Sequence, residues 1–355
     1  MATAELLEPI AGDFIGKDIV STGQFDQQDV DRVLGEADGM AVMVSEQGRC
    51  DLLSDVVVAN LFYEPSTRTF LSFEAAAKRL GAATIATQGV EYSSISKGET
   101  LEDTIRTVER YADVVAMRHS RAGAAAIAAE AARIPIINGG DGVGEHPTQA
   151  LLDLYTIKHK LGRVDGLTVT MVGDLKNGRT VHSLSRLLAL YGARLNYVSP
   201  KQLKMPESIV SELDEKGTEQ YVTQDLLEVI GESDVVYATR TQRERFKPEH
   251  GLFKALRGRR QYNKVKDGYI IDADVMRHAK PTDMILAHPF PRLNEIHTNV
   301  DSDPRAAYFD EVESGVYVRM ACLALVLGRS IYQPTQAQPA KRIIEPWMTI
   351  NGSKS

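Results

Sequence analysis

The chain has 355 residues, of which 43% are hydrophobic and 25% charged, a composition typical of soluble globular proteins. Its net charge of −7 and its lack of a basic tail argue against a nucleic-acid partner. The longest apolar runs, such as residues 320–327, are too short to span a bilayer, which argues against a membrane protein.

The length favours two domains rather than one ordinary core. Residues 1–14 contain three acidic residues and no basic one, so they match neither a secretory signal nor a transit peptide. Cys50 and Cys322 are the only cysteines, and their apolar surroundings predict buried free thiols. Together these features indicate a cytoplasmic protein.

The first half of the chain alternates predicted strands and helices. A short helix is expected from residue 26 to about 35, with Asp26 as its N-cap. Further elements follow from runs of apolar residues, which indicate strands, and from apolar residues with a period of 3.6, which indicate helices. Strands are expected at residues 56–62, 83–86, 113–117 and 134–137, and helices beginning near residues 66, 99, 122 and 147.

The second half repeats this alternation, which implies right-handed crossovers and parallel sheets. Strands are expected at residues 167–172, 195–198, 235–238, 269–271 and 284–287, and helices at residues 181–191, 207–216, 226–230 and 304–327. The predicted fold class is α/β, with two doubly wound parallel-sheet domains joined by interdomain helices. The first domain would comprise residues 1–147 plus the C-terminal helix at about 304–330, the second residues 148–303, and a tail residues 331–355.

The stretch from Ser66 to Thr69 stands between the first strand and its helix. The first N–H groups of a helix lack intrahelical partners and carry the positive end of its dipole. With the hydroxyls of Ser66, Thr67 and Thr69 and the Arg68 guanidinium, these groups would suit a dianionic phosphate. The alternative is that Ser66 and Thr67 only cap the helix while Arg68 is solvated.

Polar residues also follow several other predicted strands. In open parallel sheets, ligands bind beyond the carboxyl ends of the strands, so these residues are candidates for one or two anion sites. They are Arg118, Arg179, the segment Arg240–Gln242, the segment His288–Arg292, and His146–Gln149 at the start of a helix.

Three other kinds of site have weak support. The turn at residues 173–178 lacks the third glycine of a dinucleotide-binding fingerprint. His146 has no second histidine at metal-ligand spacing, so no metal is predicted. Ser66 lacks a nucleophile-elbow pattern and a partner base.

Six motifs together resemble those of the aspartate and ornithine carbamoyltransferases, in the family's order and over about residues 14–330. The segments at residues 64–69 and 146–153 resemble motifs shared by both branches. The segments at residues 173–175, 178–183, 239–242 and 288–292 resemble the aspartate branch.

The resemblance implies a carbamoyl-phosphate-binding first domain and an aspartate-binding second domain. The expected reaction transfers the carbamoyl group to the amine of L-aspartate, giving N-carbamoyl-L-aspartate and phosphate for pyrimidine biosynthesis, without any cofactor. Carbamoyl phosphate would be bound by Ser66, Thr67, Arg68, Thr69, Arg118, His146, Gln149, Phe290 and Pro291. Of these, Arg68, Thr69, Arg118 and His146 would be catalytic. Aspartate would be bound by Arg179, Arg240 and Gln242.

The resemblance also implies a homotrimer with shared active sites. Ser93 and Lys97 would reach the carbamoyl phosphate of the neighbouring subunit, and Lys97 also its aspartate. Without the resemblance, residues 93–97 would be assigned to a solvated surface loop. Some members of the family carry separate regulatory chains, which are therefore candidate partners here.

Two alternative functions fit these residues less well. An ornithine carbamoyltransferase would present acidic or neutral groups to the ornithine side chain, whereas Arg179 and Arg240 suit a dicarboxylate. A non-catalytic assembly subunit would be expected to lose a phosphate or carbonyl donor, and none is lost. Phe290 replaces the leucine usual in its motif, but its expected contact is through the main chain.

Overall fold

The computed structural model describes residues 7–89, 98–242 and 268–331 and divides the chain into two compact units. Unit 1 contains the described residues up to Tyr155 and from Val312 onward, and unit 2 those from Thr156 to Glu311. Helices α5 (Pro147–Leu161) and α10 (Asp310–Val326) each cross this boundary. The predicted fold class, with two parallel-sheet α/β domains, is confirmed. Ser93, Lys97 and the tail from residue 332 lie outside the described residues.

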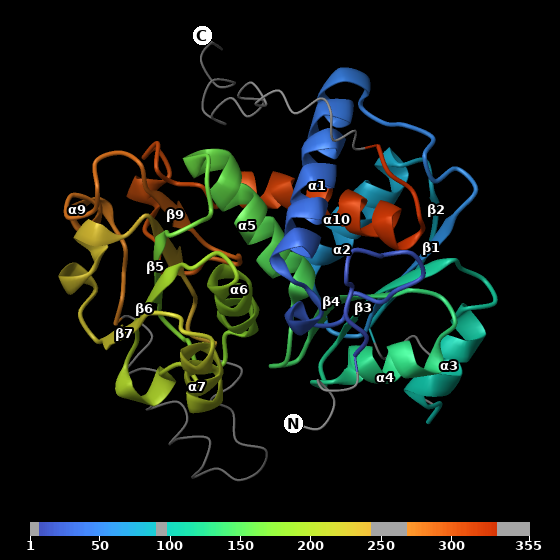
Figure 1. Cartoon of the computed structure of the whole chain (residues 1–355), viewed down its shortest axis with the longest axis horizontal. Coiled ribbons are helices and arrows are strands. Elements are labelled where there is room, and N and C mark those ends of the chain that lie inside the picture. The colour runs from blue at the N-terminus through green and yellow to red at the C-terminus, as the bar shows by residue number, and fades with distance from the viewer. Residues whose placement is uncertain (1–6, 90–97, 243–267, 332–355) are drawn as a thin grey trace. The chain divides into compact units, whose positions relative to one another are not determined.

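Unit 1 is built on four parallel strands in the order β2-β1-β3-β4 (Figure 1). The strands are β1 (Val57–Phe62), β2 (Ala83–Gln88), β3 (Val114–His119) and β4 (Ile136–Asp141). Its other helices are α1 (Gln27–Gln47), α2 (Thr67–Arg79), α3 (Leu101–Val108) and α4 (Ala124–Ala131), with the 3₁₀ turn η2 (Thr22–Gln24) before α1. The near-continuous apolar character of β1 and β3 is that of strands covered on both faces.

Unit 2 is built on five parallel strands in the order β7-β6-β5-β8-β9. The strands are β5 (Thr168–Val172), β6 (Arg194–Val198), β7 (Gln220–Thr223), β8 (Val235–Ala238) and β9 (Ile285–Ala287). The helices are α6 (Arg179–Ala189), α7 (Glu207–Glu215) and α9 (Ala273–Met276), with 3₁₀ turns η4 (Lys201–Leu203), η5 (Leu226–Glu228), η6 (Ile230–Glu232) and η8 (Thr298–Val300).

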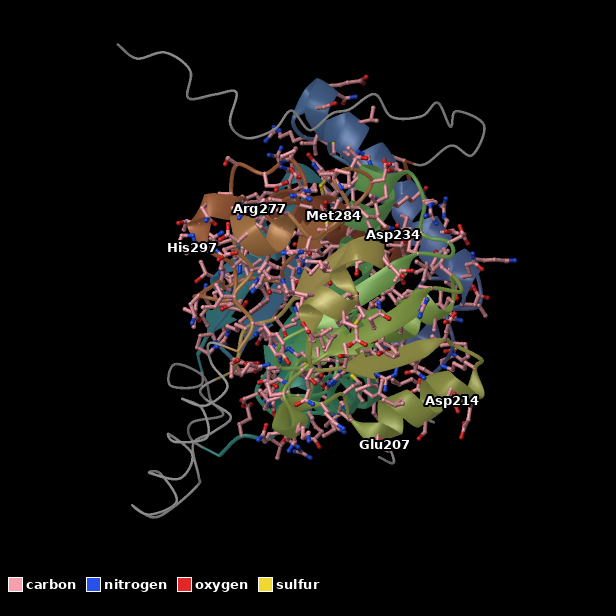
Figure 2. The ribbon with its side chains drawn as sticks, turned by 90° about the vertical axis from the view of Figure 1, so that its left-hand side faces the viewer. Glu207, Asp214, Asp234, Arg277, Met284 and His297 are labelled. Carbon is pink, nitrogen blue, oxygen red and sulfur yellow. The ribbon has the colours of Figure 1, made fainter. Side chains whose placement is uncertain are left out.

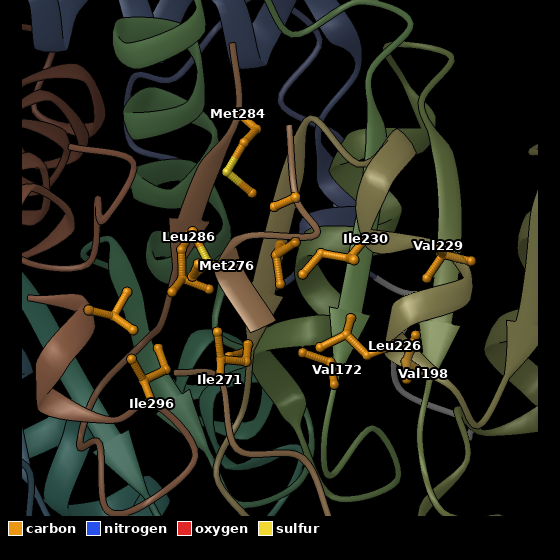
Figure 3. Packing of buried hydrophobic residues seen from close by; sticks show 14 of the residues in the cluster. Val172, Val198, Leu226, Val229, Ile230, Ile271, Met276, Met284, Leu286 and Ile296 are labelled. Carbon is orange, nitrogen blue, oxygen red and sulfur yellow. The ribbon is translucent and has the colours of Figure 1, made fainter. Parts of the chain in front are cut away.

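The core of unit 2 joins side chains from strands and from the segments that cover them. Val172 of β5 and Leu286 of β9 belong to one buried cluster with Ile230 and Met276 (Figure 3). Helix α7 is amphipathic: Ile209 and Leu213 are buried, while Glu207 and Asp214, both labelled in Figure 2, are exposed. No helix within the described residues combines the length and hydropathy that a bilayer crossing requires.

Several predicted boundaries are wrong. The helix expected to end near Gly35 continues to Gln47, because buried residues such as Ala37, Met40 and Ala41 extend its apolar face. Residues 269–271 form only an isolated bridge, between Ile271 and Ile296. The helix expected at residues 226–230 is replaced by η5 and η6, the final helix begins at Asp310 rather than 304, and β7 and α9 were not anticipated. Cys322 is buried as predicted, but Cys50 is partly exposed.

The N-terminal segment is held on β4. Ile19 donates to the Ile136 carbonyl at 2.9 Å, and the Asp18 carboxylate accepts from the Ile136 N–H at 2.7 Å. Burial raises the pKa of Asp18 to about 6; the Ile136 bond opposes this shift and Glu8 adds to it. The folded protein therefore binds this proton more tightly than the unfolded chain, and stability falls as pH rises from about 4 to about 6.

We expect Asp18→Asn to stabilise the protein at pH 7.5 by roughly 1–2 kcal/mol and to have almost no effect at pH 4. The amide oxygen can still accept from Ile136, while the cost of a partly buried anion is removed. Urea unfolding followed by far-ultraviolet circular dichroism measures the difference at both pH values. Asp13→Asn, at an exposed carboxylate of the same segment, is the control. Equal stabilisation at pH 4 and 7.5 would contradict the prediction.

Candidate active site

In unit 1 the predicted polar residues lie at the point where the strand order reverses. The chain passes from β1 to β2 on one side and to β3 on the other. Such a switch point is where open parallel sheets bind ligands. The register pairs Phe62 at the end of β1 with Arg118 of β3, so Arg118 starts beside the loop that leads to Ser66.

The residue at the N-cap position of α2 does not act as a simple helix cap. Ser66 occupies the N-cap position, yet within the described residues its side chain makes no capping hydrogen bond. Its Oγ instead donates to Thr69 Oγ1 at 3.0 Å. Thr67 and Arg68 are exposed and Thr69 is buried. The alternative that Ser66 caps the helix is therefore wrong, and the Ser66 hydroxyl does not occupy the N–H groups at the start of α2.

Arg118 is held against the loops on both sides of it. Its Nη1 donates to the Gly139 carbonyl of β4 at 3.2 Å, and its Nε lies 3.6 Å from Glu64 Oε2. A Cβ at Gly139 would lie 3.1 Å from the Met117 carbonyl and 3.4 Å from Thr69 Cγ2. Glycine at this position lets β4 approach α2 closely, which brings Thr69 and Arg118 to one place.

His146 follows a turn that is anchored by carboxylates. Asp141 accepts from the N–H groups of Gly123 and Glu145, both at 2.7 Å, and burial raises its pKa. The Glu145 carboxylate in turn accepts from the hydroxyls of Ser21 and Thr22 at 3.2 and 3.1 Å. His146 comes next and is 3% exposed, directly before the first residue of α5. These hydrogen bonds fix the turn that leads into His146.

Unit 2 has its own switch point, between β5 and β8. The register pairs Val172 with Ala238, so the loops that follow lie side by side. Asp174 is fully buried and accepts from the N–H groups of Asn177 and Gln242 at 3.1 and 3.2 Å. Gln242 Nε2 donates to the Asn177 carbonyl at 2.8 Å. These bonds join the two loops that carry Arg179, the first residue of α6, and Arg240.

Sequence profiles of two domains cover most of the chain. The profile of the aspartate/ornithine carbamoyltransferase carbamoyl-P binding domain matches residues 17–159, and that of the Asp/Orn binding domain matches residues 165–326. The chain belongs to the aspartate/ornithine carbamoyltransferase family.

Members of the family resemble the chain over nearly all of the described part. The aspartate carbamoyltransferase catalytic subunit of Thermococcus kodakarensis is 48% identical over 89% of this chain and 98% of its own. The multifunctional protein pyr1-3 of Dictyostelium discoideum is 50% identical over 89% of this chain, which spans only 14% of that relative's length. The crystal structure of Trypanosoma cruzi aspartate transcarbamoylase with carbamoyl phosphate and aspartate aligns with a TM-score of 0.82 and 43% identity, over 90% of this chain and 99% of that one.

The predicted residues divide between the family's two domains. Ser66–Thr69, Arg118, His146 and Gln149 lie in unit 1; Arg179, Arg240, Gln242, Phe290 and Pro291 lie in unit 2. Within unit 1 the structure brings Ser66, Thr69 and Arg118 around one switch point. The Gln242 amide group binds the Asn177 carbonyl, so this residue ties the loops beside Arg179 and Arg240 together.

The segment after β9 is organised by a buried pair. His288 Nε2 lies 2.7 Å from Glu295 Oε1, and its Nδ1 accepts from the Phe290 N–H at 2.9 Å. The ring therefore carries its proton on Nε2. Burial acts to raise the pKa of Glu295, but the hydrogen bond and charge of His288 together with nearby backbone N–H groups outweigh burial and lower that pKa. Phe290 has a φ of +34°, in the left-handed region, and its peptide bond to Pro291 is cis.

Sequence reasoning assigned no role to the acidic residues that hold these loops. Glu64, Asp141, Asp174 and Glu295 each bind a residue of a candidate loop or the loop backbone. One signal was available: Asp174 directly follows the apolar strand of residues 167–172 and Gly173, a position where an unpaired carboxylate would be costly.

We expect Gly173→Ala to destabilise unit 2 by at least about 3 kcal/mol. Gly173 has a φ of +117°, and a Cβ would lie 2.3 Å from the Thr239 carbonyl oxygen. Gly192→Ala separates the cost of a positive φ from the cost of the steric clash. Gly192 also has a positive φ (+61°), but no atom lies within 4 Å of its Cβ position. That control should cost only about 1 kcal/mol. Urea unfolding compares the two variants, and similar losses in both would refute the steric explanation.

Proposed function

We propose that the chain is an aspartate carbamoyltransferase that transfers the carbamoyl group of carbamoyl phosphate to the amine of L-aspartate. The observation that carries this proposal is the pair of switch points, one with the donors of Ser66–Thr69 and Arg118 and one with Arg179 and Arg240. The T. cruzi relative was crystallised with carbamoyl phosphate and aspartate, which are the two substrates of this reaction. The product, N-carbamoyl-L-aspartate, would enter pyrimidine biosynthesis.

Carbamoyl phosphate is assigned to the start of α2 and its neighbours. The phosphate binds the first N–H groups of α2, the hydroxyls of Ser66, Thr67 and Thr69, and Arg68. Thr69, Arg118 and His146 donate to the carbonyl oxygen, and Gln149 faces the carbamoyl nitrogen. The main chain at Phe290 and Pro291 completes this site.

The chemistry needs donors rather than a protein nucleophile. The aspartate amine attacks the carbonyl carbon, a C–N bond forms, and negative charge grows on the carbonyl oxygen of a tetrahedral intermediate. Donors aimed at that oxygen are worth about 3–4 kcal/mol each. The C–O bond to phosphate then breaks, and the departing phosphate takes the proton of the amine. This sequence of steps requires neither a cofactor nor a covalent enzyme intermediate.

Aspartate is assigned to unit 2, where Arg179 and Arg240 bind its two carboxylates. Guanidinium groups suit this task because they bind carboxylates in bidentate geometry. Gln242 supports both arginines by holding the two loops together, in addition to any contact with the substrate. Ornithine is disfavoured as the acceptor because its side-chain cation would face these arginines.

The active unit is proposed to be a cytoplasmic homotrimer. Ser93 and Lys97 of one subunit would complete the site of its neighbour, with Ser93 at the phosphate and Lys97 at both substrates. Separate regulatory chains remain candidates for further partners.

Arg68→Ala should lower kcat by at least about 100-fold without unfolding the protein. The side chain is exposed at the start of α2, so its loss removes a phosphate ligand and leaves the core intact. Phosphate release from carbamoyl phosphate and L-aspartate measures the rate. Arg106→Ala, at an exposed arginine of α3, is the matched control and should retain activity. Near-normal turnover by Arg68→Ala would refute the phosphate site, and an inactive, folded wild-type protein would refute the function.

Sharing of sites can be tested by mixing two inactive variants. Arg68→Ala and Lys97→Ala trimers are each expected to have very low activity. After dissociation and reassociation of an equal mixture, about a quarter of the sites of a closed cyclic trimer would pair an intact Arg68 with an intact neighbouring Lys97. Recovery of roughly that fraction of wild-type activity is expected. Failure to recover activity, in hybrids shown by native mass spectrometry to contain both chains, would contradict shared sites.

A further inference from the structure

The start of α5 contains a hydrogen bond that selects one orientation of a site residue. Gln149 Nε2 donates to Asp153 Oδ1 at 2.8 Å, one turn along the helix. A carboxylate has no proton to donate, so the amide NH₂ of Gln149 must face Asp153. The amide oxygen is thereby left as the group that Gln149 offers to a ligand.

Asp153 is not part of an ordinary surface pair. Glutamine–aspartate pairs one turn apart stabilise exposed helices slightly, but Asp153 is only 1% exposed. A buried carboxylate at this place needs compensation, and a cation provides it from the C-terminal helix α10. Asp153 interacts electrostatically with Arg319, which is itself 3% exposed.

Arg319 also connects this pair to the helix of the phosphate site. Its Nη1 donates to Ser72 Oγ of α2 at 2.8 Å and to the Gly315 carbonyl at 3.3 Å, and its guanidinium lies 5.2 Å from the centre of the Phe73 ring. Burial lowers the pKa of Arg319 to about 10, so the residue remains a cation at neutral pH. A Cβ at Gly315 would lie 2.6 Å from Arg319 Nη1, so glycine there leaves space for the guanidinium.

We propose that Asp153, supported by Arg319, is a positioning residue that makes Gln149 a hydrogen-bond acceptor for the amine of the carbamoyl group. This inference rests on the proposed function. The carbamoyl NH₂ can only donate usefully, since its lone pair is delocalised into the carbonyl, and it therefore needs an acceptor. An amide in the opposite orientation would present its own NH₂ and repel the substrate. Asp153 thus contributes to selection of carbamoyl phosphate over acyl phosphates that carry a methyl group in place of the amine.

Acetyl phosphate tests this role because it keeps the phosphate and the carbonyl and lacks the amine. The measured quantity is the ratio of its inhibition constant to the KM for carbamoyl phosphate. In Asp153→Asn, residue 153 can accept or donate, so the Gln149 amide is no longer held in one orientation. We expect the ratio to fall about three- to tenfold, which corresponds to the loss of one hydrogen bond to carbamoyl phosphate. The inhibition constant of acetyl phosphate should change little. The ratio does not depend on the fraction of protein that folds.

A double-mutant cycle separates positioning from general stability. Gln149→Ala should lower the ratio by a similar factor, and adding Asp153→Asn to it should lower the ratio no further. Asp29→Asn is the control, since the Asp29 carboxylate is equally buried in unit 1 but accepts from the N–H groups of Gly12 and Asp26 at the start of α1. It should leave the ratio unchanged.

The outcomes distinguish this inference from the proposed function. A wild-type protein that does not use carbamoyl phosphate would refute the function itself. An active wild type, with a ratio that Gln149→Ala lowers and Asp153→Asn leaves unchanged, would overturn only the role of Asp153. If the effects of Gln149→Ala and Asp153→Asn on the ratio are equal and add in the double variant, the role of Asp153 is overturned as well.

Discussion

The parallel arrangement of strands is the constraint on which both candidate sites depend. In each unit the strand order reverses once, between β1 and β3 and between β5 and β8. At such a reversal the connections leave toward opposite sides of the sheet, and the two loops in between are left with space for a ligand. The residues proposed for phosphate and for aspartate follow these four strands. Because the geometry of the backbone creates the space, side chains near strand ends and on the helices that follow them can line it.

Buried carboxylates then give these loops their shape. Asp141 accepts backbone N–H groups from Gly123 and Glu145, and Asp174 accepts them from Asn177 and Gln242. Glu295 has the same role in the segment after β9, where it binds the His288 ring and nearby N–H groups. Anchors of this kind suit an anion-binding protein, because backbone donors satisfy the carboxylate without a cation from the site.

The fold class could be predicted from sequence because its signals are local. Alternating apolar runs and helical periods gave two parallel-sheet domains, and Pro147 marked the start of α5. Boundaries failed where tertiary packing decides: α1 continues through Gly35 because its later residues are buried, and residues 269–271 form only one bridge instead of a strand. The apolar period of α1 does continue through Ala37, Met40 and Ala41, so Gly35 alone suggested the earlier end.

The residues proposed to touch the substrates could be selected from sequence, since hydroxyls and arginines at strand ends have few structural reasons to gather there. The residues that hold them were missed, because their partners are distant in sequence. Ser21 binds Glu145 across 124 positions, and Arg319 binds Ser72 across 247. A side chain's partner at such separation follows only from the packed structure.

The N-cap of α2 shows how a local rule can point to the wrong role. Serine before a helix predicts a cap, and Ser66 has the sequence position of one. Its hydroxyl instead binds Thr69 and does not occupy the first N–H groups of α2, where the phosphate is proposed to bind. A capped helix would already have satisfied one of these donors. In a chain with a net charge of −7, the proposed binding of two anionic substrates requires hydrogen-bond donors and cations gathered locally at the strand ends.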